Sequence, residues 1–314
     1  MLRALKITVS ATLIAILVWN VDWPNFLSDF RNMDPVLVIV AFILLWVQYP
    51  LSAWKWQKSL ELHGLAYPFG RLLRILCIAF FFNNFLPTAI GGDAYRAYRT
   101  MGKAKRRAHA VSAVVVERLV GIASLVFLGY VSAIYLVFNG DLLHRRSVVG
   151  AVMLATAGVF FTWLAWKSGS HEKIWSRLKS VKKLEPLIDS VRVMRRNQQH
   201  FVGLIGLSMF NQGLAIFTTA LLFAALKLPG NLFESGFTMA AAGVAGVLPL
   251  SINGIGIVES SFVVAAMETS LPYAQAVLVA LFLRAFMIVA SILFGLLYAA
   301  EPAEDRMVQK DAVN

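Results

Sequence analysis

An aspartate and two arginines follow a pair of glycines in the stretch FFNNFLPTAIGGDAYRAYR, residues 81–99. A helix that starts after these glycines would present free amide N–H groups and the positive end of its dipole, which together attract anions. On that helix Arg96 lies one turn beyond Asp93 on the same face, and Arg99 lies somewhat off it. Because a guanidinium group can grip phosphate with two hydrogen bonds, the stretch predicts an oxyanion site.

A second stretch, LPLSINGIGIVE at residues 248–259, repeats this pattern. Each stretch has an apolar run, a Leu-Pro pair, a short gap, glycines, and then an acid that opens a new helix: Asp93 in one and Glu259 in the other. Proline removes a backbone donor and glycine lets the backbone turn. Paired interrupted segments of this kind point to the central site of a transporter. The alternative is that proline and glycine only kink two ordinary spanning helices.

Three further charges fall inside apolar segments. Glu117 and Arg118 interrupt residues 110–138, and Arg284 lies in the last apolar segment. Each is about nine or ten residues into its segment, which at about 1.5 Å per residue is near the bilayer midplane. A charge there costs roughly 2.5–3.5 kcal/mol, so it should be paired and face an interior or a water-filled cavity. We expect Arg118 to pair with Glu259, and Glu117 with Arg284. Either these pairs only fix helix register, or they also line the path of an anionic headgroup.

Motifs for other chemistry are missing from the sequence. The five histidines sit at loop or helix-end positions without metal-ligand spacing, and Cys77 is the single cysteine, so neither a metal site nor a disulfide framework is expected. HExxH, GxSxG and P-loop patterns are also missing. We therefore expect no catalytic residue, no cofactor and no enzymatic activity. Asn211 and Gln212 are expected to hold helices together, with a contact to substrate as the alternative.

The elements that must position these residues are membrane helices. Of the 314 residues 59% are hydrophobic and 15% charged, and the mean hydropathy is +0.69. Several apolar windows reach the length of about 20 residues that crosses a hydrocarbon core of about 30 Å. The formal net charge of +12 sits in the loops between them. Cytoplasmic loops are rich in Lys and Arg and attract anionic lipids, so nucleic acid is not an expected partner.

Basic residues also assign the loops to sides of the membrane. Arg71 and Arg74 mark the start of the first interrupted segment, near 72–96, and more Lys and Arg follow it. The segment is therefore predicted to enter and leave on the cytoplasmic side as a re-entrant hairpin. The basic loop 167–200 is predicted to be cytoplasmic and to hold one or two amphipathic helices. The second interrupted segment, 232–268, is expected to enter from outside.

Together these assignments predict an all-α integral membrane protein. A single polytopic domain is expected over residues 1–300, with a polar tail at 301–314, and the acidic loop 22–34 is expected outside. The predicted location is the cytoplasmic (inner) membrane, with both termini in the cytoplasm. Eight ordinary spans are the alternative to two oppositely oriented re-entrant hairpins plus about six full spans, which are expected near residues 5–21, 35–58, 110–138, 147–166, 201–226 and 274–299.

The motifs NNFLPTAIGGDAYR, ERLVG at 117–121 and LPLSINGIGIVES resemble the lysylphosphatidylglycerol synthase transmembrane region, also called the flippase-like domain family. The resemblance covers nearly the whole chain. In bifunctional members a membrane domain of this kind moves an aminoacylated phospholipid between leaflets, and a following soluble domain makes that lipid. No such synthase domain is expected here, because the chain ends at Asn314. Stand-alone relatives are associated with other lipids, including polyprenyl-linked sugars and hopanoids. Thr88 departs from the glycine expected after the proline.

The resemblance and the residues together predict translocation of an amphipathic, phosphate-bearing lipid between leaflets. The expected partners are an anionic or amphipathic lipid and the membrane itself, with a separate lipid-synthesis enzyme as a further candidate. The alternatives are a membrane-embedded lipid-phosphate transferase, with Asp93 as the base, and a non-catalytic lipid-binding partner or scaffold. The expected substrate-binding residues are Asn84, Pro87, Gly91, Gly92, Asp93, Arg96, Glu117, Arg118, Asn253, Gly254, Gly256, Glu259 and Arg284.

Overall fold

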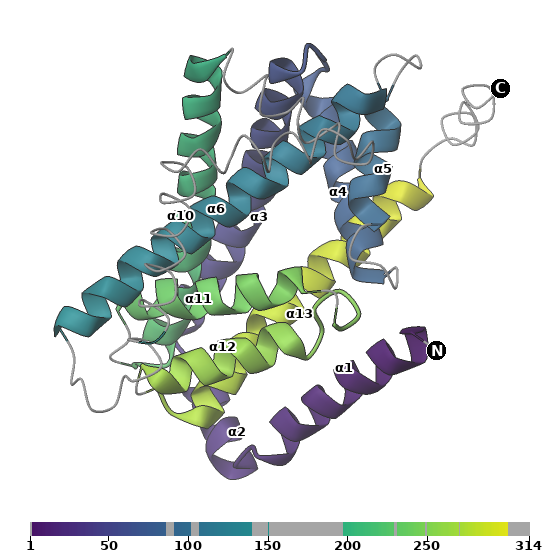
Figure 1. The fold of residues 1–314 in the computed structure, drawn as a ribbon. Coiled ribbons are helices and arrows are strands. Elements are labelled where there is room, and N and C mark those ends of the chain that lie inside the picture. Colours follow the sequence, from purple (N-terminus) through teal and green to yellow (C-terminus); the bar gives the residue numbers. More distant parts are fainter. Residues whose placement is uncertain are drawn as a thin grey trace.

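The computed structural model describes residues 2–85, 91–101, 107–139, 150, 197–228, 231–248, 250–269 and 271–300. The regular elements in these ranges are α-helices, which confirms the predicted all-α class. Within the described residues four helices are each long and apolar enough to cross a membrane: α3 (Pro35–Leu62), α6 (Arg107–Asn139), α10 (Gln198–Ala225) and α13 (Tyr273–Ala299). They form the frame of the bundle in Figure 1.

The N-terminal region is a bent pair of helices. The helices α1 (Leu2–Trp19) and α2 (Trp23–Asn32) meet at an angle of 84° and together make a fifth candidate span. The sequence predicts a loop over 22–34, and α2 occupies most of it instead. Pro24 suits the first turn of a helix, and Phe30 stacks on Phe282 of α13 at 5.8 Å. The predicted span 147–166 and nearly all of the basic loop 167–200 lie outside the described residues, so the count of six spans stays a prediction.

The first long helix begins where the sequence predicts, at Pro35. The carboxylate of Asp34 caps it by accepting hydrogen bonds from the amides of Val36 at 2.8 Å and Leu37 at 3.4 Å. The amide of Asp34 in turn donates to the carbonyl of Ala225, the last residue of α10, at 2.9 Å. The start of α3 therefore adjoins the end of α10, and the two helices run antiparallel.

Small residues bring α11 (Leu232–Val247) against α6. A Cβ atom on Gly236 would overlap the side chain of Ser132, and one on Gly243 would overlap the side chain of Leu125. Close backbone approach of this kind is how membrane helices gain packing energy when lipid surrounds them. The contact anchors α11 to a helix that crosses the whole bundle.

Two helical hairpins enter the bundle from opposite ends (Figure 1). The first consists of α4 (Phe69–Phe85) and α5 (Gly91–Thr100), and it opens at the end where α3 stops and α6 starts. The second consists of α11 and α12 (Ile257–Glu268), and it opens at the end where α10 stops and α13 starts. In each hairpin the two helices lie side by side rather than in line. Each of the two interrupted segments, predicted near 72–96 and 232–268, thus forms a pair of helices, and their re-entrant course through the membrane stays a prediction.

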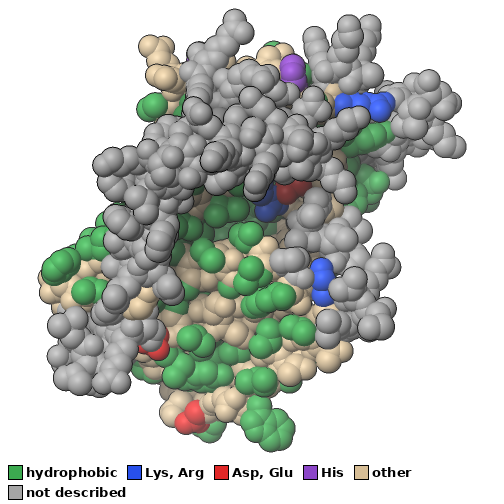
Figure 2. Space-filling model, in the orientation of Figure 1, with side chains coloured by type: hydrophobic (Ala, Val, Ile, Leu, Met, Phe, Trp, Pro, Cys, Tyr) green, Lys and Arg blue, Asp and Glu red, His purple; other side chains and the backbone are tan. Residues whose placement is uncertain are grey.

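The outer surface carries many exposed hydrophobic side chains, as Figure 2 shows for one face. On α3 alone, Val36, Ile39 and Ile43 are 64%, 58% and 54% exposed. Water would penalise such a surface, whereas the hydrocarbon core of a membrane solvates it. With the long apolar helices, this makes the chain a multi-pass membrane protein.

Candidate functional site

The tips of the two hairpins touch each other through predicted site residues. Asn84, at the end of α4, accepts a hydrogen bond at 2.6 Å from the side-chain amide of Asn253, in the break between α11 and α12. The side-chain amide of Asn84 also donates to the hydroxyl of Ser291 on α13. Segments 169 residues apart in the sequence are thus joined by a hydrogen bond between the two hairpins.

The start of α5 lies very close to α4. Gly91 is the first residue of α5, and a Cβ atom on Gly92 would overlap the carbonyl oxygen of Ala79. The amide of Gly92 donates to the side-chain oxygen of Asn83 at 2.8 Å. The prediction that this amide is free to bind an anion is therefore wrong, because the neighbouring helix supplies an acceptor. Pro87 lies outside the described residues.

The turn of the second hairpin uses left-handed backbone. Asn253, Gly254 and Gly256 have φ angles of +48°, +73° and +86°, which favour glycine and tolerate asparagine. The amide of Gly256 donates to the carboxylate of Glu259 at 2.7 Å. The glycines supply the turn as predicted, but the predicted free amide at Gly256 is again wrong, because the acid that opens α12 occupies it.

Five charged side chains from three helices form one network, which we call the charged cluster: Lys55, Asp93, Arg96, Glu117 and Arg118. The carboxylate of Glu117 lies 2.6 Å from Lys55 Nζ and 2.9 Å from Arg96 Nη2. The carboxylate of Asp93 lies 3.5 Å from Arg96 Nη1 and 2.7 Å from Arg118 Nε. The guanidinium of Arg96 also lies 4.4 Å from the centre of the Trp56 ring. The predicted residues of α5 and α6 are thus brought together.

The predicted partners of the deep charges are wrong. Arg118 pairs with Asp93 rather than with Glu259, and Arg284 pairs with Glu259 rather than with Glu117. The reason is packing. The first hairpin places α5 beside α6, and α12 packs against α13, so each arginine meets the acid of a neighbouring helix. The two groups of predicted charges are therefore separate clusters, one at each hairpin.

Lys55 is the functional candidate that sequence reasoning missed. The sequence places it among the basic residues at the inner membrane boundary, whereas it is only 5% exposed in the structure. A signal was present, because Gln48, Ser52, Lys55 and Ser59 recur at helical spacing along one face of α3. A polar stripe on an otherwise apolar membrane helix indicates a buried or cavity-facing surface.

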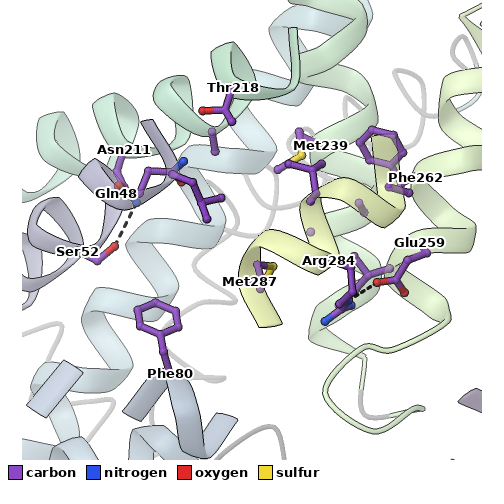
Figure 3. A pocket seen from close by; sticks show the side chains of 18 of the residues that line it. Gln48, Ser52, Phe80, Asn211, Thr218, Met239, Glu259, Phe262, Arg284 and Met287 are labelled. Atoms are coloured by element: carbon purple, nitrogen blue, oxygen red, sulfur yellow. Dashed lines mark hydrogen bonds and ion pairs between the residues drawn. The ribbon is translucent and has the colours of Figure 1, made fainter. Parts of the chain in front are cut away.

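Two cavities adjoin at this stripe. The apolar cavity, of about 330 Å³, contains Arg284 and Glu259 on one wall and Gln48, Ser52 and Asn211 on the other, as Figure 3 shows. The charged cavity, of about 220 Å³, is lined by Lys55, Arg96, Glu117 and Arg118 of the charged cluster together with Asn83 and Gln212. Ser52 and Phe80 line both cavities, so the two cavities lie on either side of these side chains.

Asn211 and Gln212, which are neighbours on α10, have separate partners. The side-chain amide of Gln212 donates to the carbonyl of Gly121 on α6 at 3.1 Å, which confirms that it holds helices together. Asn211 approaches the hydroxyl of Ser52 on α3 at 3.5 Å, and its side-chain oxygen is buried without a hydrogen-bond partner among the described residues. Asn211 therefore keeps an acceptor available beside the apolar cavity.

Comparison with known protein families covers nearly the whole chain. A family model described as the lysylphosphatidylglycerol synthase TM region matches residues 3–295. A UPF0104 membrane protein of Methanothermobacter thermautotrophicus is 23% identical over 267 residues, which cover 77% of this chain and 78% of that protein. Another from Methanocaldococcus jannaschii is 24% identical over 270 residues, 80% of each chain. The chain therefore belongs to the family of the lysylphosphatidylglycerol synthase TM region, as its motifs predict.

Proposed function

We propose that this protein moves an amphipathic, phosphate-bearing lipid between the two leaflets of the cytoplasmic membrane without changing it chemically. In this proposal the hairpin of α4 and α5 opens toward the cytoplasm, where Arg71 and Arg74 lie, and both termini are cytoplasmic. The hairpin of α11 and α12 opens toward the outside. The family membership supports a lipid-related function in the membrane.

The observation that carries the proposal is the pair of adjoining cavities between two opposed hairpins. Moving a charged headgroup through hydrocarbon is slow because each charge loses its hydration there, at a cost of several kcal/mol. Here one cavity is lined by Lys55, Arg96, Glu117 and Arg118 of the charged cluster, the other is lined by the ion pair of Glu259 and Arg284, and Ser52 and Phe80 line both. A headgroup that passes from one cavity to the other always has a polar partner within reach.

The exposure of the charged side chains suggests an order in which they contact the phosphate. Arg118 is the most exposed member of the charged cluster, with 46% of its side chain accessible, so it is placed to meet an incoming phosphate first. The phosphate then exchanges with the acids that hold Lys55 and Arg96, moves past Ser52 and Phe80, and reaches Arg284. The acyl chains stay in contact with the hydrophobic outer surface throughout. Either facilitated exchange or coupling to the proton gradient through Glu117 or Glu259 is compatible with this route.

The test is a reconstituted leaflet-exchange assay. Purified protein is inserted into liposomes that carry a fluorescent phospholipid, and a membrane-impermeant reductant is added outside. Wild-type protein should make the inner-leaflet lipid accessible, and Arg118→Gln should slow this exchange. Glu61, which pairs with Lys58 on the exposed side of α3, offers the control variant Glu61→Gln.

Lipid extraction after the assay separates translocation from the transferase alternative. Unchanged lipid with rapid exchange supports the proposal, and a new lipid product would replace it by an enzymatic function. Wild-type liposomes in which no phosphate-bearing lipid exchanges faster than in protein-free liposomes would refute the proposal.

A further inference from the structure

The charged cluster has an uncompensated positive charge. It contains three cations, Lys55, Arg96 and Arg118, and two anions, Asp93 and Glu117. The ion pairs that these side chains make within the described residues all lie inside the cluster. One positive charge is therefore left over at the charged cavity.

Four of the five side chains in the charged cluster are largely shielded from solvent. Those of Lys55, Arg96 and Glu117 are each 7% exposed and that of Asp93 is 15% exposed, whereas that of Arg118 is 46% exposed. An unbalanced charge in such surroundings is strongly unfavourable unless another ion neutralises it. The arrangement therefore calls for one additional negative charge in or beside the cavity.

The cavity also offers room beside cationic groups. Its volume of about 220 Å³ is several times the roughly 30 Å³ that one water molecule occupies in the liquid. Lys55, Arg96 and Arg118 all line it, and ammonium and guanidinium groups form strong hydrogen bonds with oxyanions.

We infer that the charged cavity selects a lipid headgroup with one net negative charge, a phosphodiester without a compensating cation, and that Lys55 sets this charge preference. The inference rests on the proposed function, which makes a lipid phosphate the ligand. A phosphodiester monoanion neutralises the cluster. A dianionic phosphomonoester would leave it negative, and a zwitterionic headgroup would leave the original excess in place.

Two substitutions change the charge count in opposite directions. Lys55→Gln removes a positive charge and makes the cluster neutral, whereas Glu117→Gln removes a negative charge and leaves two excess positive charges. Lys55→Arg keeps the count unchanged. Lys58→Gln is the matched control, because Lys58 lies one turn further along the same helix, partly exposed and paired with Glu61 outside the cavity.

The experiment measures equilibrium binding of three lipids to the full chain in nanodiscs at pH 8. The probes are phosphatidylmethanol, a monoanionic diester; phosphatidic acid, a dianionic monoester; and phosphatidylcholine, a zwitterion. Wild type, Lys55→Arg and Lys58→Gln should bind phosphatidylmethanol at least about tenfold more tightly than phosphatidylcholine, a difference of about 1.4 kcal/mol. Lys55→Gln should lose this preference, and Glu117→Gln should shift it toward phosphatidic acid.

The outcomes separate this inference from the proposed function. Equal affinities of the wild type for the three lipids, or an unchanged preference in a folded Lys55→Gln variant, would overturn the inference even where leaflet exchange is normal. A charge preference without leaflet exchange would leave the site in place and overturn the proposed function. Dimethyl phosphate, added at the same concentration as the lipid, should not compete; full competition would identify a soluble phosphodiester as the ligand and overturn the lipid assignment.

Discussion

The glycine at the turn of the first hairpin gives the sharpest stability prediction. In Gly92→Ala the added Cβ would meet the carbonyl oxygen of Ala79 and the side chain of Asn83, which lies 2.7 Å from the Cβ position. Backbone cannot yield as a flexible side chain does, so α5 must move away from α4. Overpacking of this kind costs typically about 1–3 kcal/mol. The hydrogen bond between the Gly92 amide and Asn83 would be strained as well, at about 1 kcal/mol.

The expected destabilisation is therefore about 2–4 kcal/mol, from the two contributions together. Gly70→Ala is the matched control, because Gly70 lies in the same hairpin and a Cβ there has nothing within 4 Å. That substitution should be neutral or stabilise by roughly 0.5–1 kcal/mol, since alanine favours a helix over glycine.

Thermal unfolding of both variants in the same detergent measures the difference. Gly92→Ala should lower the midpoint by several degrees and reduce leaflet exchange, while Gly70→Ala should leave the midpoint unchanged or raise it. A Gly92→Ala protein as stable as wild type would mean that α5 does not approach α4 as closely as the structure has it. If both variants were destabilised equally, the cost at position 92 would have a cause other than steric contact, because a Cβ at position 70 meets no atom within 4 Å.

Three more predictions follow from the hairpin contacts and from His63. Asn253→Gly keeps the left-handed backbone but removes the hydrogen bond to Asn84, so leaflet exchange should change while stability falls by only about 1 kcal/mol in denaturant unfolding. Glu259→Gln should lower the free energy of unfolding by about 3–5 kcal/mol. The double variant Glu259→Arg with Arg284→Glu should not restore stability, because the Glu259 carboxylate also accepts a hydrogen bond from the amide of Gly256 at the start of α12; full recovery in thermal melts would contradict this. Burial lowers the pKa of His63, whose Nδ1–H donates to the carbonyl of Ser59 at 2.7 Å, so protonation disfavours the folded state. The contribution of His63 is complete above the unfolded pKa of about 6.5 and is lost as pH falls through the lower folded pKa, so melting points measured between pH 7.5 and 5.5 should fall more in wild type than in His63→Gln.

Several features of the fold could be predicted because they depend on local chemistry. Pro35 behind a capping Asp34 marks the start of α3, since proline fits the first turn and aspartate accepts the free amides. Gly254 and Gly256 mark the turn between α11 and α12, because few other residues tolerate the positive φ angles found there. Asp93 and Arg96 share a face because their spacing is helical. Each of these follows from neighbours in the chain.

The partners of the charged residues could not be predicted in the same way. Glu117 meets Lys55 and Arg96 because of how α3, α5 and α6 are rotated and spaced, and several pairings of acids and bases satisfy the same sequence. Lys55 reads as a boundary residue because lysines commonly end a membrane helix, and only the covering helices make it buried. Whether an amide at the start of a helix stays free likewise depends on whether a neighbouring helix places an acceptor beside it, as α4 does with Asn83.

The amino-acid sequence is enough to identify a helical membrane protein of the lysylphosphatidylglycerol synthase TM family, with two interrupted segments and charges within them. Hydropathy, capping and turn chemistry act over a few residues, so they are readable along the chain. Only the packing of the helices brings Asn84 to Asn253 and puts the charged cluster and Arg284 at separate cavities that share the lining residues Ser52 and Phe80. Such contacts join distant segments whose relative rotation is fixed by side-chain packing, and that packing has no local signature.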